Sequence, residues 1–187
     1  GSGALDVNTT ASYNTGIGFA ALGVNTTGAG NSAVGSFALD ANTTGSDNVA
    51  VGKYALTANT TGSENTGVGL LAMDRTTTGG YNTALGSHSL RYNTTGANNV
   101  SVGKNSMYQN TTGGSNTALG HSALSENSTA SNNTAVGYYA LYANTTGANN
   151  VAIGKDAMIA NTTAASNVAI GVDAMDANTS GADNVAV

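Results

Sequence analysis

The sequence predicts an all-β protein, a parallel β-solenoid of eleven coils with 17 residues in each coil. The pattern N-T-A-V-G-x-x-A-L-x-x-N-T-T-G-x-x runs through residues 1–187 without an insertion or deletion, and a fixed period of this kind is typical of solenoids. A repeat offers only two large aliphatic side chains, so stacked coils must share one core. We therefore treat 1–187 as a single repeat array and number its positions 1 to 17, with Asn14 at position 1.

Positions 1 to 5 predict a short strand that ends at a glycine bend, as in Asn150–Gly154. Position 4 is aliphatic and position 5 is glycine in every repeat, while position 9 is always Leu or Met. We expect the side chains at positions 4 and 9 to stack from coil to coil as the core.

The rest of the repeat is predicted to be irregular. Positions 6 to 11 fit either a second strand or one helical turn, because Gly at 5, Asn at 12 and Gly at 15 interrupt any longer helix. The N-T-T-G segment at positions 12 to 15 has the residues of a turn. Its paired Thr residues are expected to form hydroxyl ladders, one facing inward and one outward.

Asparagine recurs at position 1 in all eleven repeats and at position 12 in all but one, where Thr76 replaces it. Stacked amides can hydrogen-bond along such a row, so we predict a structural Asn ladder. Its position-1 members are Asn14, Asn31, Asn48, Asn65, Asn82, Asn99, Asn116, Asn133, Asn150, Asn167 and Asn184.

All fifteen Asp, Glu, Lys and Arg residues, both His and all ten aromatics lie at positions 6, 7, 10, 11 or 17, which we expect to face solvent. Five aromatics at positions 6 and 7 predict one surface-binding edge for a glycan or a protein. They are Phe19, Phe37, Tyr54, Tyr138 and Tyr139. The alternative is burial of these rings between subunits, although Lys53, Lys104 and Lys155 share position 6 and argue against uniform burial.

Composition excludes several classes of function. The chain has no Cys, only five Lys and Arg residues and a net charge of −5, which argues against nucleic acid as a partner. No apolar run approaches the roughly 20 residues of a membrane span, so we expect no membrane insertion in this segment. His88 and His121 lack convergent partners, and Asp173, Asp176 and Asp183 offer too few oxygens for calcium. We expect no catalytic residue, no metal site, no cofactor and no enzymatic activity.

Glycosylation sequons are periodic as well, at position 12 of the repeat. If the host glycosylates, the acceptors would be Asn8, Asn25, Asn42, Asn59, Asn93, Asn110, Asn127, Asn144, Asn161 and Asn178. The alternative, which we favour, is that N-T-T-G is simply a stable turn.

Two forms of the repeat carry a resemblance that covers the whole chain. N-V-A-I-G, at Asn150–Gly154 and Asn167–Gly171, resembles the head repeats of YadA-like trimeric autotransporter adhesins. The longer form that starts at Asn133 is similar to repeats of phage tail fibres and bacterial tail-fibre surface proteins. This resemblance implies a left-handed β-roll in a parallel homotrimer, displayed on a cell surface or a virion fibre. Adhesin heads commonly have shorter repeats, so we expect an added bulge near N-T-T-G.

These observations predict an extracellular structural and adhesive fibre segment that serves surface attachment or host recognition. A purely structural extracellular filament or coat without a receptor is the alternative. Ice binding is a weaker one, because the adjacent Thr residues at positions 13 and 14 face opposite sides. Because no repeat looks like a cap, we expect the chain to be an excerpt of a longer solenoid.

Overall fold

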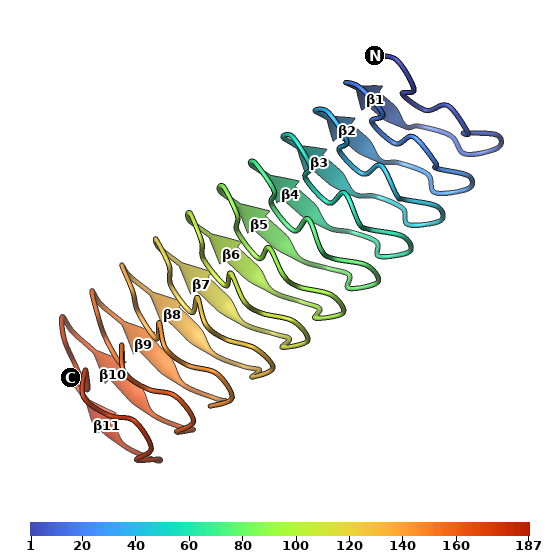
Figure 1. The fold of residues 1–187 in the computed structure, drawn as a ribbon. Helices are drawn as coiled ribbons and strands as arrows, with labels where there is room; N and C mark the ends of the chain where they lie inside the picture. The colour runs from blue at the N-terminus through green and yellow to red at the C-terminus, as the bar shows by residue number, and fades with distance from the viewer.

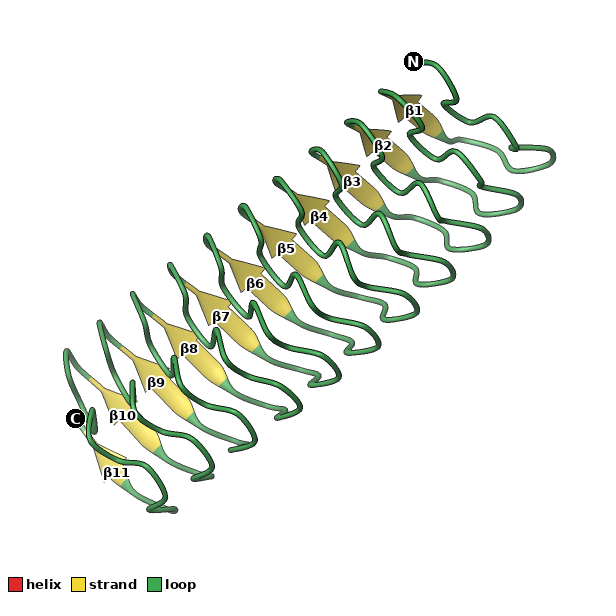
Figure 2. Cartoon of the chain, viewed as in Figure 1, coloured by secondary structure: helices red, strands yellow, loops and turns green.

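The computed structural model describes all residues from Gly1 to Val187 as a rod in which each repeat makes one coil (Figure 1). Short strands on one side of the rod alternate with long irregular segments, and there is no helix (Figure 2). The strands are β1 (Thr15–Ile17), β2 (Ser32–Val34), β3 (Val49–Val51), β4 (Thr66–Val68), β5 (Thr83–Leu85), β6 (Val100–Val102), β7 (Thr117–Leu119), β8 (Thr134–Val136), β9 (Val151–Ile153), β10 (Val168–Ile170) and β11 (Val185–Ala186).

The eleven strands form one parallel sheet in the order of the sequence. Thr15 pairs with Ser32 and Ile17 pairs with Val34, so the register between neighbouring strands equals the 17-residue repeat. Residues with the same repeat position therefore form rows along the rod. The predicted all-β parallel solenoid with one coil per repeat is confirmed, and the strand occupies positions 2 to 4 of the predicted 1 to 5.

Positions 6 to 11 form neither a second strand nor a helical turn. Within one coil the backbone takes positive φ at Phe37 (59°), Leu39 (51°) and Asp47 (58°), which are positions 7, 9 and 17. Such conformations are costly for bulky residues and need support from their surroundings. That support comes from both neighbouring coils, because Phe37 N donates to Phe19 O at 2.8 Å and Leu39 N donates to Ala55 O at 3.0 Å.

The core is narrower than the sequence predicted. Leu or Met at position 9 and Ala at positions 3 and 8 are fully buried, as Leu39, Ala33 and Ala38 illustrate. Position 4 is not in the core: Val51 and Leu85 are each 38% exposed. Side chains alternate along a strand, so positions 2 and 4 point outward when the small residue at position 3 points inward. The prediction that position 4 packs inside the coil was wrong.

Two asparagine ladders complete the interior and lie next to each other, since Asn31 Nδ2 and Asn42 Nδ2 both donate to Gly45 O. At position 1, Asn99 Nδ2 donates to Asn82 Oδ1 at 3.1 Å and to Gly113 O at 2.9 Å. At position 12, Asn42 Nδ2 donates to Asn25 Oδ1 at 2.7 Å. The predicted amide ladders are therefore present, and they satisfy buried backbone groups as well as one another.

The Thr rows differ from the expectation of hydroxyl ladders. At position 13 the hydroxyl bonds to backbone, as when Thr43 Oγ1 donates to Thr60 O of the next coil at 3.0 Å. At position 14 the side chain is exposed, as at Thr44 and Thr61. The inward and outward orientation of the pair is as predicted, but the inner row is tied to carbonyl oxygens and not to other hydroxyls.

Candidate association face and binding edge

The outer face of the sheet carries an unbroken row of aliphatic side chains beside a row of small, uncharged ones. Its central row is position 4, where Val34, Val51, Leu119, Ile153 and Ile170 are 36–40% exposed. Position 2 adds a parallel row of Thr, Ser and Val, and no charged residue occurs at either position. Exposed apolar surface that extends over a whole sheet is characteristic of a contact region. We call the outward side chains of positions 2 and 4 the association face.

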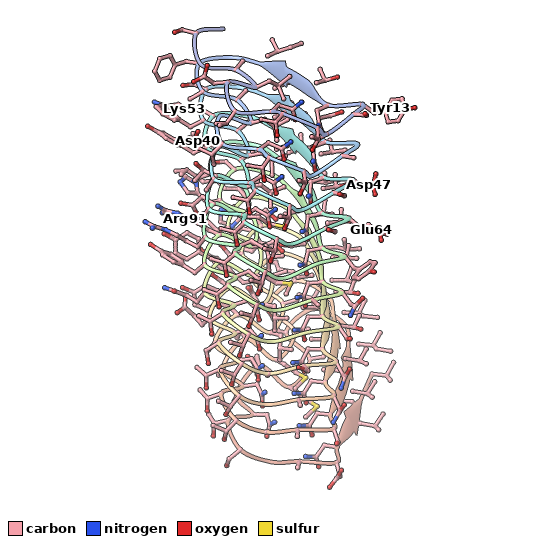
Figure 3. The ribbon with its side chains drawn as sticks, turned by 90° about the vertical axis from the view of Figure 1, so that its right-hand side faces the viewer. Tyr13, Asp40, Asp47, Lys53, Glu64 and Arg91 are labelled. Carbon is pink, nitrogen blue, oxygen red and sulfur yellow. The ribbon has the colours of Figure 1, made fainter.

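The variable positions form the two edges of the rod. Figure 3 shows Asp40, Lys53 and Arg91 projecting from one edge, whereas Tyr13 and Glu64 project from the other. Their repeat positions explain the division, because 6, 7, 10 and 11 lie in the bend after the strand and 17 lies just before it. We call the edge formed by positions 6, 7, 10 and 11 the mixed edge.

The five predicted aromatics lie on the mixed edge in two separate groups. The ring of Phe37 contacts those of Phe19 and Tyr54, with centroid distances of 5.2 Å on both sides. Tyr138 and Tyr139 meet at 4.3 Å further along the rod. The coils between them carry Leu, Ser, Lys, His and Asn at positions 6 and 7, so no unbroken aromatic stripe exists.

Three tyrosines at positions 10 and 11, which the sequence analysis did not single out, belong to the same edge. Tyr142 packs against Tyr139 with centroids 4.9 Å apart, and Tyr108 packs against Tyr92 at 5.1 Å. Tyr108 also approaches His88 of the preceding coil at 6.3 Å. The sequence signal for this contact was the spacing of three residues between positions 7 and 10, because the bend places the two positions beside each other.

A hollow of about 430 Å³ opens on the mixed edge between these groups. Its floor includes Ser122 and Ser125, each only 4% exposed. Row 10 has Tyr108 in the coil before Ser125 and Tyr142 in the coil after it. The hollow therefore exists because two small residues in one coil lie between larger side chains at the same positions of the two adjacent coils. We call it the serine hollow.

A second hollow of about 370 Å³ lies nearer the N-terminus, beside the Phe37–Tyr54 stack. Asp74 forms its charged wall with Arg91, whose Nε lies 3.2 Å from Asp74 Oδ1. Asp74 is 3% exposed, an exception to the prediction that the variable positions face solvent. Desolvation raises the pKa of Asp74 despite the attraction of Arg91 and Arg75. The second hollow is therefore walled by a largely buried ion pair.

Arg91 also connects the two hollows. Its Nη1 donates to the hydroxyl of Tyr108 at 3.0 Å, and its guanidinium lies 5.0 Å from the centre of the Tyr92 ring. The guanidinium therefore has carboxylate, hydroxyl and aromatic partners at once, which restricts its movement. Through this contact, Arg91 orients Tyr108 at the border of the serine hollow.

Both histidines line the serine hollow. His88 Nδ1 is 2.8 Å from Ser87 Oγ, and burial together with Arg91 lowers the pKa of His88. No carboxylate orients the second ring nitrogen, so the pair lacks the third member of a catalytic triad. His121 stacks on Tyr138 at 5.4 Å, and its Nδ1 is buried without a hydrogen-bond partner. Aromatic stacking therefore holds the His121 ring in place, and no hydrogen bond does.

No group of three or more metal-binding side chains is brought together in the structure. Asp173 and Asp176 lie on the mixed edge, whereas Asp183 occupies position 17 and belongs to the opposite edge. The fold thus separates the three carboxylates whose proximity the sequence left open.

The sequon asparagines belong to the position-12 ladder. The side chains of Asn25, Asn59 and Asn144 are fully buried, and Asn144 Nδ2 donates to both Asn127 Oδ1 and Gly147 O. Attaching a glycan to such a nitrogen would replace one of its two N–H donors, break one of these hydrogen bonds and require space that the neighbouring coil occupies. The geometry favours the interpretation of N-T-T-G as a turn.

No protein-family model matches the chain, and comparison with curated proteins and with solved structures finds no significant match. The structure also has no helix that could span a bilayer. The functional argument therefore depends on the surfaces of this chain.

Proposed function

We propose that this chain is a segment of an extracellular fibre that is displayed on a cell surface or virion and serves attachment. In this proposal the coil is left-handed, three copies associate side by side as a parallel homotrimer, and the mixed edge binds glycan or protein on a target surface. The role is structural and adhesive, without catalysis and without a cofactor.

The association face is the observation that carries this proposal. The accessible positions 6, 7, 10 and 11 tolerate charged, polar and aromatic residues alike, as solvated positions do. Position 4 is about as accessible in several coils, yet it is Val, Ile or Leu in all eleven repeats. A position that is outward and uniformly apolar is best explained by burial against another chain.

A second copy of the chain is the partner that fits this face best. Any partner must present apolar groups at the spacing of the coils, about 4.8 Å, over the whole length of the sheet. Another copy of the chain has the same spacing because it is built from the same coils. Three rods arranged around a common axis run in the same direction and bury one face each, which leaves every mixed edge at the outside for binding.

Light scattering after size exclusion tests the association. We expect a mass close to three times 18.3 kDa. Replacing Leu85 and Leu119 with Lys places two charges on the association face and should yield single chains. The matched control replaces Thr95 and Thr129, exposed residues at position 14, with Lys and should leave the mass unchanged. A single-chain mass for the unmodified protein at all concentrations would exclude the trimer.

A structural filament or coat without a receptor is the second candidate, and the Asn ladders support it. The rows join successive coils throughout the rod, from Asn14 to Asn184, and give it mechanical continuity that does not depend on any binding site. The two functions separate in an adhesion assay with labelled fibre on host cells, where a purely structural filament shows no saturable binding.

Ice binding has weaker support. An ice-binding surface needs regular outward hydroxyls, but position 2 alternates irregularly between Thr, Ser and Val beside an aliphatic row. The inner Thr row uses its hydroxyls on backbone carbonyls, which leaves only the single row at position 14. Measurement of thermal hysteresis would show an effect only if this row orders water.

A further inference from the structure

We infer that the serine hollow is a saccharide-binding site that accommodates a pyranose ring between Tyr108 and Tyr142, above Ser122 and Ser125. This inference depends on the proposed adhesive role and adds its ligand class and its place. It also moves the binding site away from most of the aromatic residues that the sequence suggested.

The size and lining of the hollow suit a small polar ligand. Its volume of about 430 Å³ lies in the range of about 300–1,000 Å³ that is usual for small-molecule sites. Ten residues line it, and the three apolar ones are all tyrosines. A wholly apolar ligand would leave the other seven polar or charged side chains without partners, which is unfavourable.

A pyranose has the two kinds of surface that this lining requires. Its C–H groups form an apolar face that packs on aromatic rings, and its hydroxyls both donate and accept hydrogen bonds. Tyr108 and Tyr142 stand in the same row two coils apart, at about 9.6 Å from twice the usual strand spacing. Ser125 lies between them, so a ring can enter the gap with an aromatic wall on each side.

Charged side chains of both signs also line the hollow. Lys104 supplies a donor from position 6, and Glu126 supplies an acceptor from position 11 at the other end of the bend. Burial and the nearby Glu126 raise the pKa of Tyr142, so its phenol stays protonated at neutral pH. Because the hollow offers both signs of charge, it does not require a charged sugar.

The backbone around the hollow argues against a peptide ligand. Ser122 N donates to Lys104 O at 3.0 Å, Tyr139 N donates to His121 O at 3.1 Å, and Glu126 N donates to Tyr142 O at 3.1 Å. These amides are occupied by bonds between coils, so no free strand edge is available for pairing with an extended peptide. Recognition must therefore go through side chains, which suits a sugar.

Saturation-transfer NMR on the intact chain tests this inference, with the methyl pyranosides of glucose, galactose, N-acetylglucosamine and N-acetylneuraminic acid as probes. We expect at least one of them to receive saturation, most strongly at its ring C–H protons. Replacing Ser125 with Tyr fills the gap with a residue that row 10 already accepts in the adjacent coils, and should reduce binding at least about tenfold. Tyr142→Ala should reduce it similarly by removing a wall.

Thr57→Tyr is the matched control, because it introduces the same side chain at position 10 beside the second hollow. It should leave saccharide binding unchanged, and circular dichroism should show the same fold for all variants. The inference is overturned if no pyranoside binds, or if Ser125→Tyr binds as well as the unmodified chain.

Adhesion of labelled fibre to host cells separates this inference from the proposed function. Adhesion that is abolished by periodate oxidation of cell-surface sugars and by Ser125→Tyr supports both. Adhesion that survives periodate but is lost after protease treatment overturns the saccharide and keeps the adhesive fibre. Absence of adhesion to any surface rejects the adhesive function itself.

Discussion

Asn48 and Asn31, in neighbouring coils, are joined by two hydrogen bonds to a single oxygen. Both the backbone N and the side-chain Nδ2 of Asn48 donate to Asn31 Oδ1, each at 3.0 Å. The same Nδ2 donates to Gly62 O at 2.9 Å. One amide thus connects its own coil to the preceding one and satisfies a carbonyl in the turn that follows it fourteen residues later. Because such groups are fully buried, any gap in a row should be measurable as a loss of stability.

The chain contains one natural gap, at Thr76 in row 12. Asn59 Oδ1 and Thr76 Oγ1 are both buried and have no hydrogen-bond partner. We predict that Thr76→Asn stabilises the rod, because the introduced amide can donate to Asn59 Oδ1 and accept from Asn93. The gain should be about 1–2 kcal/mol in the free energy of unfolding, the value of one or two satisfied buried groups.

Chemical denaturation of Thr76→Asn beside the unmodified chain measures this gain. Thr76→Val is the control, since it removes the unpaired hydroxyl while leaving Asn59 unsatisfied, and should give a smaller change. A lower stability for Thr76→Asn would show that the ladder has a steric requirement at this coil that hydrogen bonding does not capture.

The repeat period predicted the coil, the parallel register and the Asn rows because they are consequences of one constraint. If each repeat makes one coil, Asn14 and Asn31 must occupy equivalent places in adjacent coils, and every row must contain like residues. The repeat period does not predict whether the side chain at position 4 points into the coil or away from it. Hydrophobicity alone does not predict whether Val34 points into its own coil or away from it. Val34 is 36% exposed in the structure, whereas Ala33 is small enough for the narrow interior.

The mixed edge was only partly predictable for a different reason. The backbone of the bend has positive φ at residues such as Phe37, Tyr54 and Leu56, which are not residues that signal a turn. Without knowledge of that backbone geometry, the sequence does not predict that positions 7 and 10 lie side by side. A hollow made by small residues such as Ser122 and Ser125 is harder still to predict, because its signal is the absence of bulk.

Glycine at position 5 is predicted to be irreplaceable inside the rod. Gly86 has a φ of +133°, and a Cβ built on it would lie 2.7 Å from Gly103 O of the next coil. Gly86→Ala should therefore lower the free energy of unfolding by about 3 kcal/mol or more, through backbone strain and a clash with backbone that cannot move.

A substitution at Gly171 distinguishes backbone strain from the clash with the next coil. Its φ is +135°, but an added Cβ would meet only Ala174 Cβ, at 3.8 Å. Gly171→Ala should lose only the conformational part, about 1–2 kcal/mol. Equal losses for the two variants, measured by denaturant unfolding, would show that contact between coils does not contribute.

Two leucines five residues apart should respond differently to truncation. Leu90 at position 9 is fully buried, whereas Leu85 at position 4 is 38% exposed. We predict that Leu90→Ala lowers stability by about 2–5 kcal/mol, because it leaves a cavity in the core. Leu85→Ala should cost less, about 1–2 kcal/mol when the chain is single, since part of the side chain is already in contact with water and no closed cavity is left.

The association state provides the second readout for the leucine pair. If the association face is buried between copies, Leu85→Ala should weaken self-association in analytical ultracentrifugation. Leu90→Ala should have no direct effect on the interface as long as the rod is folded. An unchanged dissociation constant for Leu85→Ala would argue that position 4 is not an interface.

His88 should titrate below the usual value near 6.5, because burial first and Arg91 second lower its pKa, with Asp74 acting in the opposite direction. The unfolded chain then binds more protons than the folded chain between the two pKa values. Stability should therefore fall as pH drops from 6.5 toward the folded pKa of His88, and this contribution should be absent above that window.

Proton NMR of the imidazole measures the pKa of His88 directly. Arg91→Gln should raise it by removing a positive neighbour, whereas Asp74→Asn should lower it further. A pKa that is unmoved by Arg91→Gln would mean that desolvation, Asp74 and Lys104 set the pKa of His88 without Arg91, and that Arg91 affects the serine hollow only through Tyr108.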